Sequence, residues 1–162
     1  MDEGLPCIII IILVIFSAFF SSAETAYTSC NRIRLKTEAD DGNKKSQSIH
    51  NILEKYDRLL STVLIGNNIV NIASASLATV VFTSIFHENG SWISTLVMTI
   101  IVLIFGEVVP KGIAKNNAEG LAKFYLPLIK ILIFIFFPLS WVLEKISSLF
   151  NILVKSEEND ET

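Results

Sequence analysis

Two carboxylates and several hydroxyl and amide side chains lie inside long apolar stretches of this sequence, where polar groups are costly unless they are satisfied. The carboxylates are Glu24 in the first apolar run and Glu107 in the third. Ser17, Ser21 and Thr28 lie at helical spacing with Glu24, so the first run carries one polar stripe. An ionisable residue in such a place is a functional-site hypothesis by default.

A second polar stripe follows in the next apolar run. Asn67, Asn71 and Ser74 share one helical face, and Asn68 flanks them. The stripe continues into small residues over 73–78, which allow helices to pack closely in lipid. Helix packing alone is an alternative explanation for the serines and small residues, because serine often bonds its own backbone. Three asparagines within five residues fit that alternative less well.

The third apolar run ends in a helix break that exposes oxygen atoms. Pro110 has no N–H, and in a helix that group would bond the carbonyl of Gly106. The sequence therefore predicts a free Gly106 carbonyl beside the charge of Glu107, as in the broken helices of transporters. The alternative is a proline-terminated helix in which Glu107 pairs with Lys111 at i+4.

Depth in the bilayer relates the three runs to one another. At about 1.5 Å per residue, Ser21 lies roughly 24 Å and Glu107 roughly 22 Å below the outer ends of their runs. By the same count, Asn67 and Asn71 lie roughly 6 and 12 Å from the cytosolic side. All three runs therefore place oxygen atoms in the inner half of the bilayer.

These positions predict one site built from oxygen ligands. The expected metal ligands are Ser17, Ser21, Asn67, Asn71, the Gly106 carbonyl and Glu107, with Glu24, Asn68, Ser74 and Pro110 as support or coupling-ion residues. Six oxygens that include one carboxylate, with no sulfur or imidazole, suit a hard cation such as Mg2+ rather than zinc, copper or iron. An enzyme is not expected, because no nucleophile has a base within the spans.

The composition supplies the apolar helices that such a site needs. The chain has 162 residues, of which 51% are hydrophobic and 18% charged, and its mean hydropathy is +0.55. These values exclude a soluble domain and a disordered chain. Two cysteines and a net charge of -3 exclude a disulfide scaffold and a free-standing nucleic-acid binder. The sequence predicts an all-α membrane protein.

Three apolar runs are predicted to span the membrane, over about 5–28, 59–86 and 92–110, since each is near or above the roughly 20 residues that cross a bilayer. A signal peptide is an alternative for the first run, but its leading residues Asp2 and Glu3 are acidic where positive charge is expected. One membrane domain is expected over residues 1–150, followed by an acidic tail over residues 151–162.

The distribution of Lys and Arg predicts the orientation. Residues 31–58 contain seven of them and residues 111–123 contain three, whereas residues 1–7 and 87–91 contain none. Because basic loops stay in the cytosol, the N-terminus is expected outside. Segment 31–58 is expected to form short cytosolic helices on either side of a turn at residues 40–43.

The fourth apolar run, within residues 124–150, is expected to form a bent juxtamembrane or re-entrant helix. Pro127 and Pro138 are expected to break it, Lys130 lies inside it, and Trp141 is typical of a membrane interface. A clean fourth crossing is the alternative, and the parity of crossings does not exclude it.

Three motifs on these runs resemble the membrane domain of the CorC and cyclin-M (CNNM) magnesium transporter family. They are Ser17-Ala-Phe-Phe-Ser21-Ser-Ala-Glu24-Thr-Ala, Gly66-Asn-Asn-Ile-Val-Asn71 and Phe105-Gly-Glu-Val-Val-Pro110-Lys. The motifs occur in the same order with a shared topology, and the resemblance covers nearly the whole chain. It places the family's cation ligands on the same oxygen set, with Glu24 as a helper in Na+ coupling or as a structural partner.

The resemblance implies a homodimer of three-span protomers in the plasma or inner membrane, with an outside N-terminus and a juxtamembrane belt helix. It also implies export of dehydrated Mg2+, bound from the inward-facing side, in exchange for Na+. Family members continue into a cytosolic CBS-pair domain that binds nucleotides. A Mg2+-sensing scaffold that does not transport is the alternative. The coupling ion, the direction of transport and the selectivity among divalent cations stay open.

Overall fold

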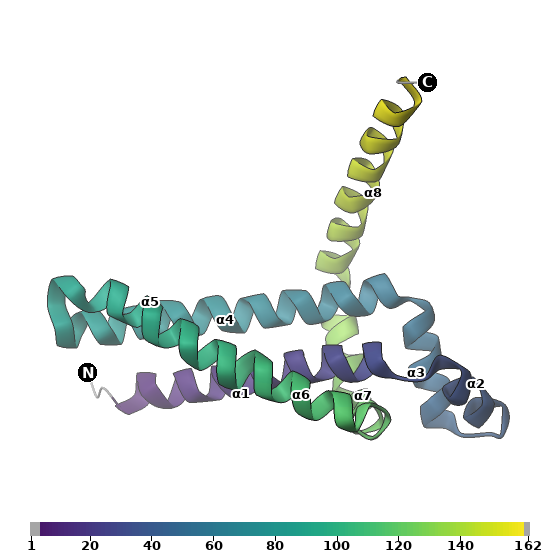
Figure 1. Cartoon of the computed structure of the whole chain (residues 1–162), viewed down its shortest axis with the longest axis horizontal. Coiled ribbons are helices and arrows are strands. Elements are labelled where there is room, and N and C mark those ends of the chain that lie inside the picture. Colours follow the sequence, from purple (N-terminus) through teal and green to yellow (C-terminus); the bar gives the residue numbers. More distant parts are fainter. Residues whose placement is uncertain (1–3, 161–162) are drawn as a thin grey trace.

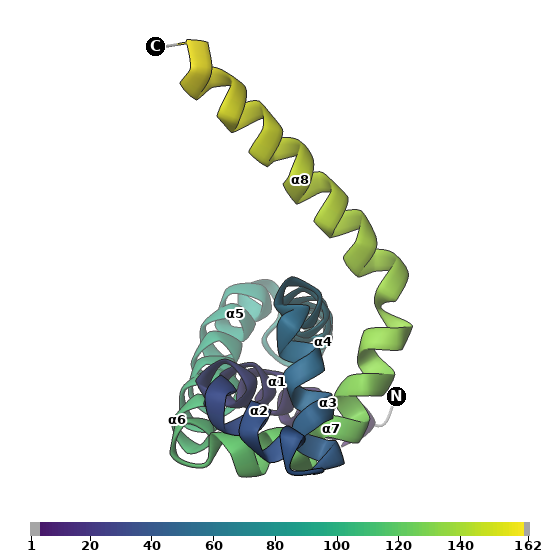
Figure 2. The same cartoon turned by 90° about the vertical axis from the view of Figure 1, so that its right-hand side faces the viewer.

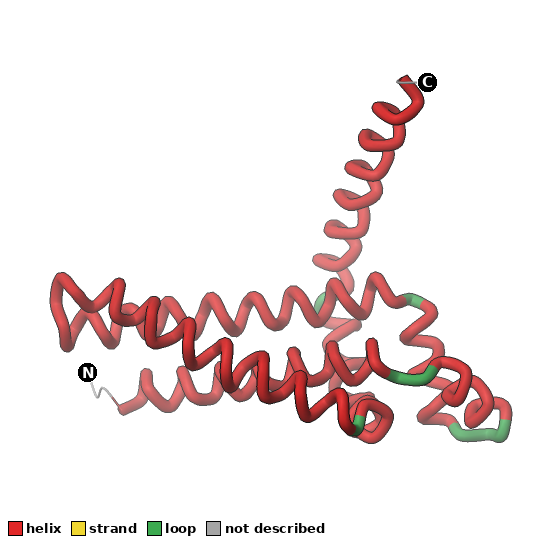
Figure 3. Tube along the Cα trace, viewed as in Figure 1, coloured by secondary structure: helices red, strands yellow, loops and turns green. Residues whose placement is uncertain are grey.

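The computed structural model describes residues 4–160, with the side chains of residues 4–152, and this range is helical without a strand. The elements are α1 (Gly4–Ser29), α2 (Arg32–Asp40), α3 (Lys44–Glu54), α4 (Tyr56–Phe86), η1 (His87–Asn89), α5 (Gly90–Ile101), η2 (Val102–Val108), α6 (Val109–Asn116), α7 (Ala118–Ile135) and α8 (Phe137–Asp160). Only short connections separate them, as the green segments of Figure 3 show. The predicted all-α class is confirmed.

Three helical arms lie side by side and form the body of the molecule (Figure 1). α1 and α4 run in opposite directions, and α5, η2 and α6 return along them as one arm. Helices α2 and α3 sit at one end of this bundle, and η1 lies at the other. The three arms correspond to the predicted runs 5–28, 59–86 and 92–110.

The second and third arms connect through a tight reversal at η1. His87 has a φ of 52°, which few residues other than glycine adopt. Gly90 packs against the backbone of Phe82 and Thr83, where a Cβ atom would have no room. This close approach folds α5 back along α4.

Two helical segments in the described residues are long and apolar enough to cross a membrane. An 18-residue stretch within Gly4–Ser29 has a mean hydropathy of 2.7, and one within the run Tyr56–Asn116, which contains the η1 reversal, has a mean hydropathy of 2.2. Helices α7 and α8 together make a third candidate, but they are bent by 70° at their junction, as in a broken span or a re-entrant loop. The chain is therefore a membrane protein with two to three candidate spans.

The arms expose apolar side chains, and the buried core lies near the end that carries α2 and α3. On α1 the exposed residues include Leu5, Ile8, Ile11, Ile12 and Ile15. The core cluster includes Tyr27, Leu35, Ile49, Leu53, Ala122 and Ile129 from α1, α2, α3 and α7. Continuous apolar exposure of this kind is rare on soluble monomers, whereas a bilayer would cover it.

Helices α2 and α3 form the predicted pair. The side chains of Asn31 and Asn43 cap their first turns by accepting backbone N–H bonds, and Gly42 makes the intervening turn with a φ of 95°. Asparagine is among the best N-cap residues, so these starts are encoded locally.

Glu38 ties both short helices to α7. Its carboxylate accepts from Lys123 Nζ at 2.8 Å and from Ser46 Oγ at 2.6 Å, and Arg34 Nε lies 3.2 Å away. These bonds, led by the Lys123 bond, lower the pKa of Glu38 to about 2. Arg34 also approaches Glu119 of α7 at 3.5 Å.

Helix α7 crosses the α2–α3 end of the bundle, and α8 extends away from it (Figures 1 and 2). Tyr27 Oη donates to the Ala122 carbonyl at 3.1 Å, and the Ser22 and Tyr125 hydroxyls lie 3.2 Å apart, so α1 holds α7 in place. The transverse position agrees with the expected belt helix. α8 continues to Asp160, so much of the expected acidic tail is helical.

The predicted break at Pro127 is wrong, because α7 continues through that residue. Leu126 and Ile129 are buried against the core on either side of it, and this packing keeps the helix intact despite one lost backbone bond. The bend falls instead at Phe136, just before Pro138 in the first turn of α8. Proline is tolerated there because first-turn N–H groups have no helical partner.

Candidate functional site

The first polar contact between α1 and α4 joins Ser17 to Asn67. Ser17 is fully buried, and its Oγ donates to Asn67 Oδ1 over 3.2 Å. A glycine makes this approach possible, because the Phe20 ring packs on the backbone of Gly66, where a Cβ atom would collide with it. Phe20 and Gly66 thus set the spacing of the two helices.

The third arm reaches the same serine through Gly106. A Cβ atom on Gly106 would lie 2.8 Å from Ser17 Oγ and 3.3 Å from Ser17 Cβ, so the η2 backbone packs directly on this side chain. Three elements therefore meet at Ser17. From its depth in the bilayer, Ser21 was predicted to lie level with Glu107. The observed contact with the third arm is instead made by Ser17, one helical turn earlier on α1.

The backbone around Gly106 is a π-helix over Val102–Val108, and it passes directly into α6. The predicted helix break at this position is therefore wrong, because the chain changes its hydrogen-bond register here and stays helical past Pro110 to Asn116. In this register the Val109 N–H bonds the carbonyl of Ile104, five residues back. The next N–H along the chain would belong to Pro110, which has none. Without an N–H at residue 110, the Phe105 carbonyl cannot accept a π-type bond from it and the Gly106 carbonyl cannot accept an α-type bond from it. The carbonyl oxygen next to Ser17 therefore lacks that donor. Short π segments occur frequently at functional sites.

Ser21 and Asn71 extend the oxygen lining on either side of this contact. Ser21 Oγ and Asn71 Oδ1 are both buried and have no hydrogen-bond partner. Ser21 follows Ser17 by one turn and Asn71 follows Asn67 by one turn, each about 6 Å along its helix. Because α1 and α4 are antiparallel, the two unpartnered oxygens lie on opposite sides of the Ser17–Asn67 pair (Figure 1).

The two carboxylates of the predicted set differ in their surroundings. Glu24 Oε2 lies 3.5 Å from Lys111 Nζ, so this ion pair joins α1 to α6. The alternative pairing of Lys111 with Glu107 is not observed. Glu107 is half-buried, and among the described residues it has no ion pair. Its carboxylate is therefore not neutralised by a lysine or arginine in the described residues.

The remaining predicted residues have different environments. Ser74 is buried and donates to the backbone carbonyl of Asn71 at 3.0 Å, which supports the packing explanation for this serine. Asn68 is exposed, and Pro110 is buried at the start of α6. In the small-residue segment, Ala78 is buried within the chain.

The donor set suits a hard cation and no other common metal. Within the described residues, no three His, Cys, Asp or Glu side chains gather as a metal cluster. A cation at Ser17 would thus be held by hydroxyl, amide and carbonyl oxygens with one nearby carboxylate. Unpartnered buried oxygens are costly in an apolar interior, and a bound cation would satisfy them.

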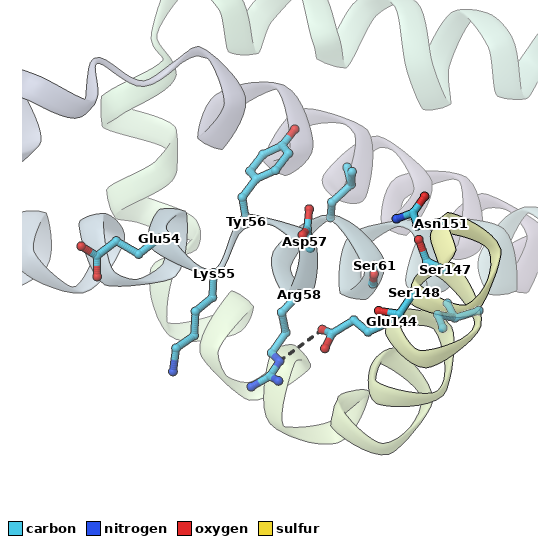
Figure 4. Close-up of a pocket in the computed structure, with 12 residues that line it drawn as sticks. Glu54, Lys55, Tyr56, Asp57, Arg58, Ser61, Glu144, Ser147, Ser148 and Asn151 are labelled. Carbon is cyan, nitrogen blue, oxygen red and sulfur yellow. Dashed lines mark hydrogen bonds and ion pairs between the residues drawn. The ribbon is translucent and has the colours of Figure 1, made fainter. Parts of the chain in front are cut away.

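A pocket of about 740 Å³ lies elsewhere, between the start of α4 and α8 (Figure 4). None of the predicted ligands lines it. Arg58 Nε and Glu144 Oε1 are 3.5 Å apart across it, and Arg58 also stacks on Phe137 at 4.8 Å. The sequence did not predict this pairing, the Phe20–Gly66 contact or the π-helix. For the Phe20–Gly66 contact a signal was available, because Gly66 begins the motif Gly66-Asn-Asn-Ile-Val-Asn71.

A family model described as the cyclin M transmembrane N-terminal domain (CNNM) matches residues 8–162. The chain is 42% identical over 134 residues to the Escherichia coli "UPF0053 inner membrane protein YfjD", covering 81% of this chain and 31% of that protein. It is 39% identical over 136 residues to a Haemophilus influenzae "UPF0053 protein", covering 84% of this chain and 32% of that protein.

A more distant Haemophilus influenzae relative, named "Polyamine export protein", is 24% identical over 154 residues, covering 87% of this chain and 36% of that protein. The chain spans about a third of the length of these curated relatives.

Proposed function

Since the chain belongs to the cyclin M (CNNM) transmembrane-domain family, we propose that it is the membrane domain of a transporter that exports Mg2+. A role in membrane ion transport or export is consistent with the family and with the helical membrane fold. The observation that carries the proposal is the meeting of Ser17, Asn67 and Gly106 between the unpartnered oxygens of Ser21 and Asn71.

The chemistry of Mg2+ explains why such a site is needed. The ion prefers six oxygens at about 2.1 Å and gives up its water reluctantly, so a dehydrated ion requires fixed replacements. The hydroxyl, amide and carbonyl oxygens supply neutral ligands, and Glu107 supplies the anionic one. Ser21 and Asn71 continue this lining in both directions along α1 and α4, so a bound ion has a next position to occupy.

The topology in this proposal has three crossings with the N-terminus outside and α2, α3 and α7 on the cytosolic side. Mg2+ enters from the cytosol, and Na+ moving the other way drives export. The functional unit is a homodimer in the plasma or inner membrane, with a CBS-pair region expected in the full-length protein. Glu24 contributes through its ion pair with Lys111.

A polyamine is a second candidate cargo, because a relative carries the name of a polyamine exporter. Ammonium groups can donate hydrogen bonds to the same neutral oxygens and pair with the same carboxylate. A third alternative is a Mg2+ sensor, in which binding biases a cytosolic partner without flux.

Flux in proteoliposomes tests these alternatives. We expect Mg2+ efflux to follow an imposed Na+ gradient and to fall by about tenfold or more in Glu107→Gln, which keeps the shape of the side chain and removes its charge. Glu88→Gln is the matched control, because Glu88 is exposed in η1, away from the site. Its flux should equal that of the wild type.

Each alternative predicts its own result in flux and binding measurements. Spermidine flux without Mg2+ flux would establish the polyamine as cargo. Mg2+ binding by calorimetry without flux under any gradient would establish the sensor. Equal Mg2+ flux in Glu107→Gln and the wild type would remove Glu107 from the site.

A further inference from the structure

A basic groove lies between α3, the start of α4 and α7, away from the oxygen site. Its volume is about 320 Å³, and its polar lining consists of Lys55, Arg58 and Lys130 together with Ser48 and Asn51. The rest of the lining is aliphatic, and it includes neither a carboxylate nor an aromatic ring. We call these five residues the basic groove.

The positive charge of the groove is only partly neutralised. Among the described residues, neither Lys55 nor Lys130 forms an ion pair, and Lys130 Nζ donates to Ser48 Oγ at 3.0 Å. Arg58 faces one carboxylate, Glu144, over 3.5 Å. Figure 4 shows the Lys55 and Arg58 side chains extending the same way, whereas Asp57 points in the opposite direction.

A neighbouring pocket shares Lys130 with the basic groove and also contains charged side chains. It has a volume of about 370 Å³, and Lys45, Lys123 and Lys130 contribute its charge. Lys123 is already paired with Glu38 at 2.8 Å. In the described residues Lys45 forms no ion pair either, so unpaired positive charge lies on both sides of Lys130.

The groove adjoins a lipid-facing surface. Ile131 and Phe134 follow Lys130 on α7, and their side chains are 55% and 82% exposed. α7 crosses the α2–α3 end of the bundle (Figure 2). Lys130 bonds Ser48 of α3, so it lies between the exposed apolar residues of α7 and the charged helix α3. Phospholipid phosphates occupy that level of a membrane.

We propose that the basic groove binds the phosphate of an anionic phospholipid. Lys55, Lys130 and Arg58 supply the positive charge, and the Ser48 hydroxyl and Asn51 amide supply hydrogen-bond donors. The aliphatic lining and the exposed α7 face accommodate the start of the acyl chains. A phosphate ion or a nucleotide shares the phosphate chemistry, but neither would use the adjoining apolar surface, and no aromatic ring in the lining could stack on a base.

Lipid titration in detergent tests this site. Protein in a nonionic detergent is titrated with dihexanoyl phosphatidylglycerol, and binding is followed by native mass spectrometry and by the rise in melting temperature. We expect the double variant Lys55→Gln/Lys130→Gln to bind it at least about tenfold more weakly. The matched control Lys36→Gln/Lys115→Gln removes two exposed lysines outside the groove and should bind as the wild type does.

Three further measurements make the outcome decisive. Lys55→Arg/Lys130→Arg should retain binding, which separates lost charge from a damaged fold. Dihexanoyl phosphatidylcholine, which is zwitterionic, should bind weakly and equally to all variants. Equal phosphatidylglycerol binding by the Gln double variant and the wild type would overturn the proposal, as would inorganic phosphate that binds as tightly as the lipid and displaces it.

Discussion

Ser17 is the residue at which the three arms meet, since its hydroxyl bonds Asn67 and lies against the Gly106 backbone. The small size of the Ser17 side chain matters as much as its hydroxyl oxygen, because the η2 backbone at Gly106 packs directly against it. Ser21 and Asn71 flank it with buried oxygens that have no partner. At this scale two buried side-chain oxygens stay unsatisfied, which is unfavourable for folding, and the proposed cation would satisfy them.

The substitution Gly106→Ala tests whether this contact is required. The new methyl group would lie 2.8 Å from Ser17 Oγ, so the serine or the η2 backbone must shift, and we expect this shift to disturb the bond to Asn67. We expect Mg2+ binding, measured by calorimetry on the purified protein, to weaken by about tenfold or more. Gly112→Ala is the control, because nothing lies within 4 Å of its added Cβ. Undiminished binding in Gly106→Ala would count against a site at Ser17.

At the scale of elements, a partly exposed ionic cluster fastens α2 and α3 to α7. Glu38 accepts bonds from Lys123 and Ser46, and its pKa of about 2 is below the usual 4.5. A carboxylate whose pKa is lowered by folding stabilises the fold above its unfolded pKa and loses that effect as pH falls through the folded value. The attachment of α7 should therefore weaken between about pH 4.5 and 2.

Lys123→Met tests that attachment. Without its main partner the pKa of Glu38 should return towards the usual value, so the variant should lose less stability than the wild type between about pH 4.5 and 2. Melting temperature against pH measures this, and the difference between the two curves cancels other titrating acids. Lys36→Met, at an exposed position on α2, is the control. Parallel curves for the Lys123 variant and the wild type would refute the role of this pair.

At the scale of the whole molecule, α4 presents an uncovered small-residue surface. Ser74 and Ala78 are buried within the chain, but Ala75 and Ser76 are exposed. Small residues on a membrane helix allow a second helix to approach closely. This face is our candidate for the contact between two copies of the chain.

Cysteine crosslinking checks the dimer face in membranes. In a background that lacks Cys7 and Cys30, Ala75→Cys and Ser76→Cys should form intersubunit crosslinks with a short reagent. Ser74→Cys, at a buried position, should not. Removing Cys30 is a precaution only, since burial raises its thiol pKa to about 11 and makes it unreactive. Absence of crosslinks at both exposed positions would exclude this face.

The sequence by itself determined the features that depend on local patterns. Apolar run length predicted the arms that became α1, α4 and α5 to α6, because hydropathy acts on each segment separately. Asn31 and Asn43 cap the short helices within their own first turns. The two polar stripes, one through Ser17 and one through Asn67, were predicted because helical periodicity places the polar residues of each run on one face of its helix.

Only the tertiary structure decided how those faces meet. The packing of Gly106 on Ser17, the Phe20–Gly66 contact and the Glu24–Lys111 ion pair each depend on the rotation and spacing of helices that are distant in sequence. Pro127 stays inside α7 for the same reason, since core packing outweighs its local preference to end a helix. Side-chain volumes from several segments set these positions together, and no single segment contains that information.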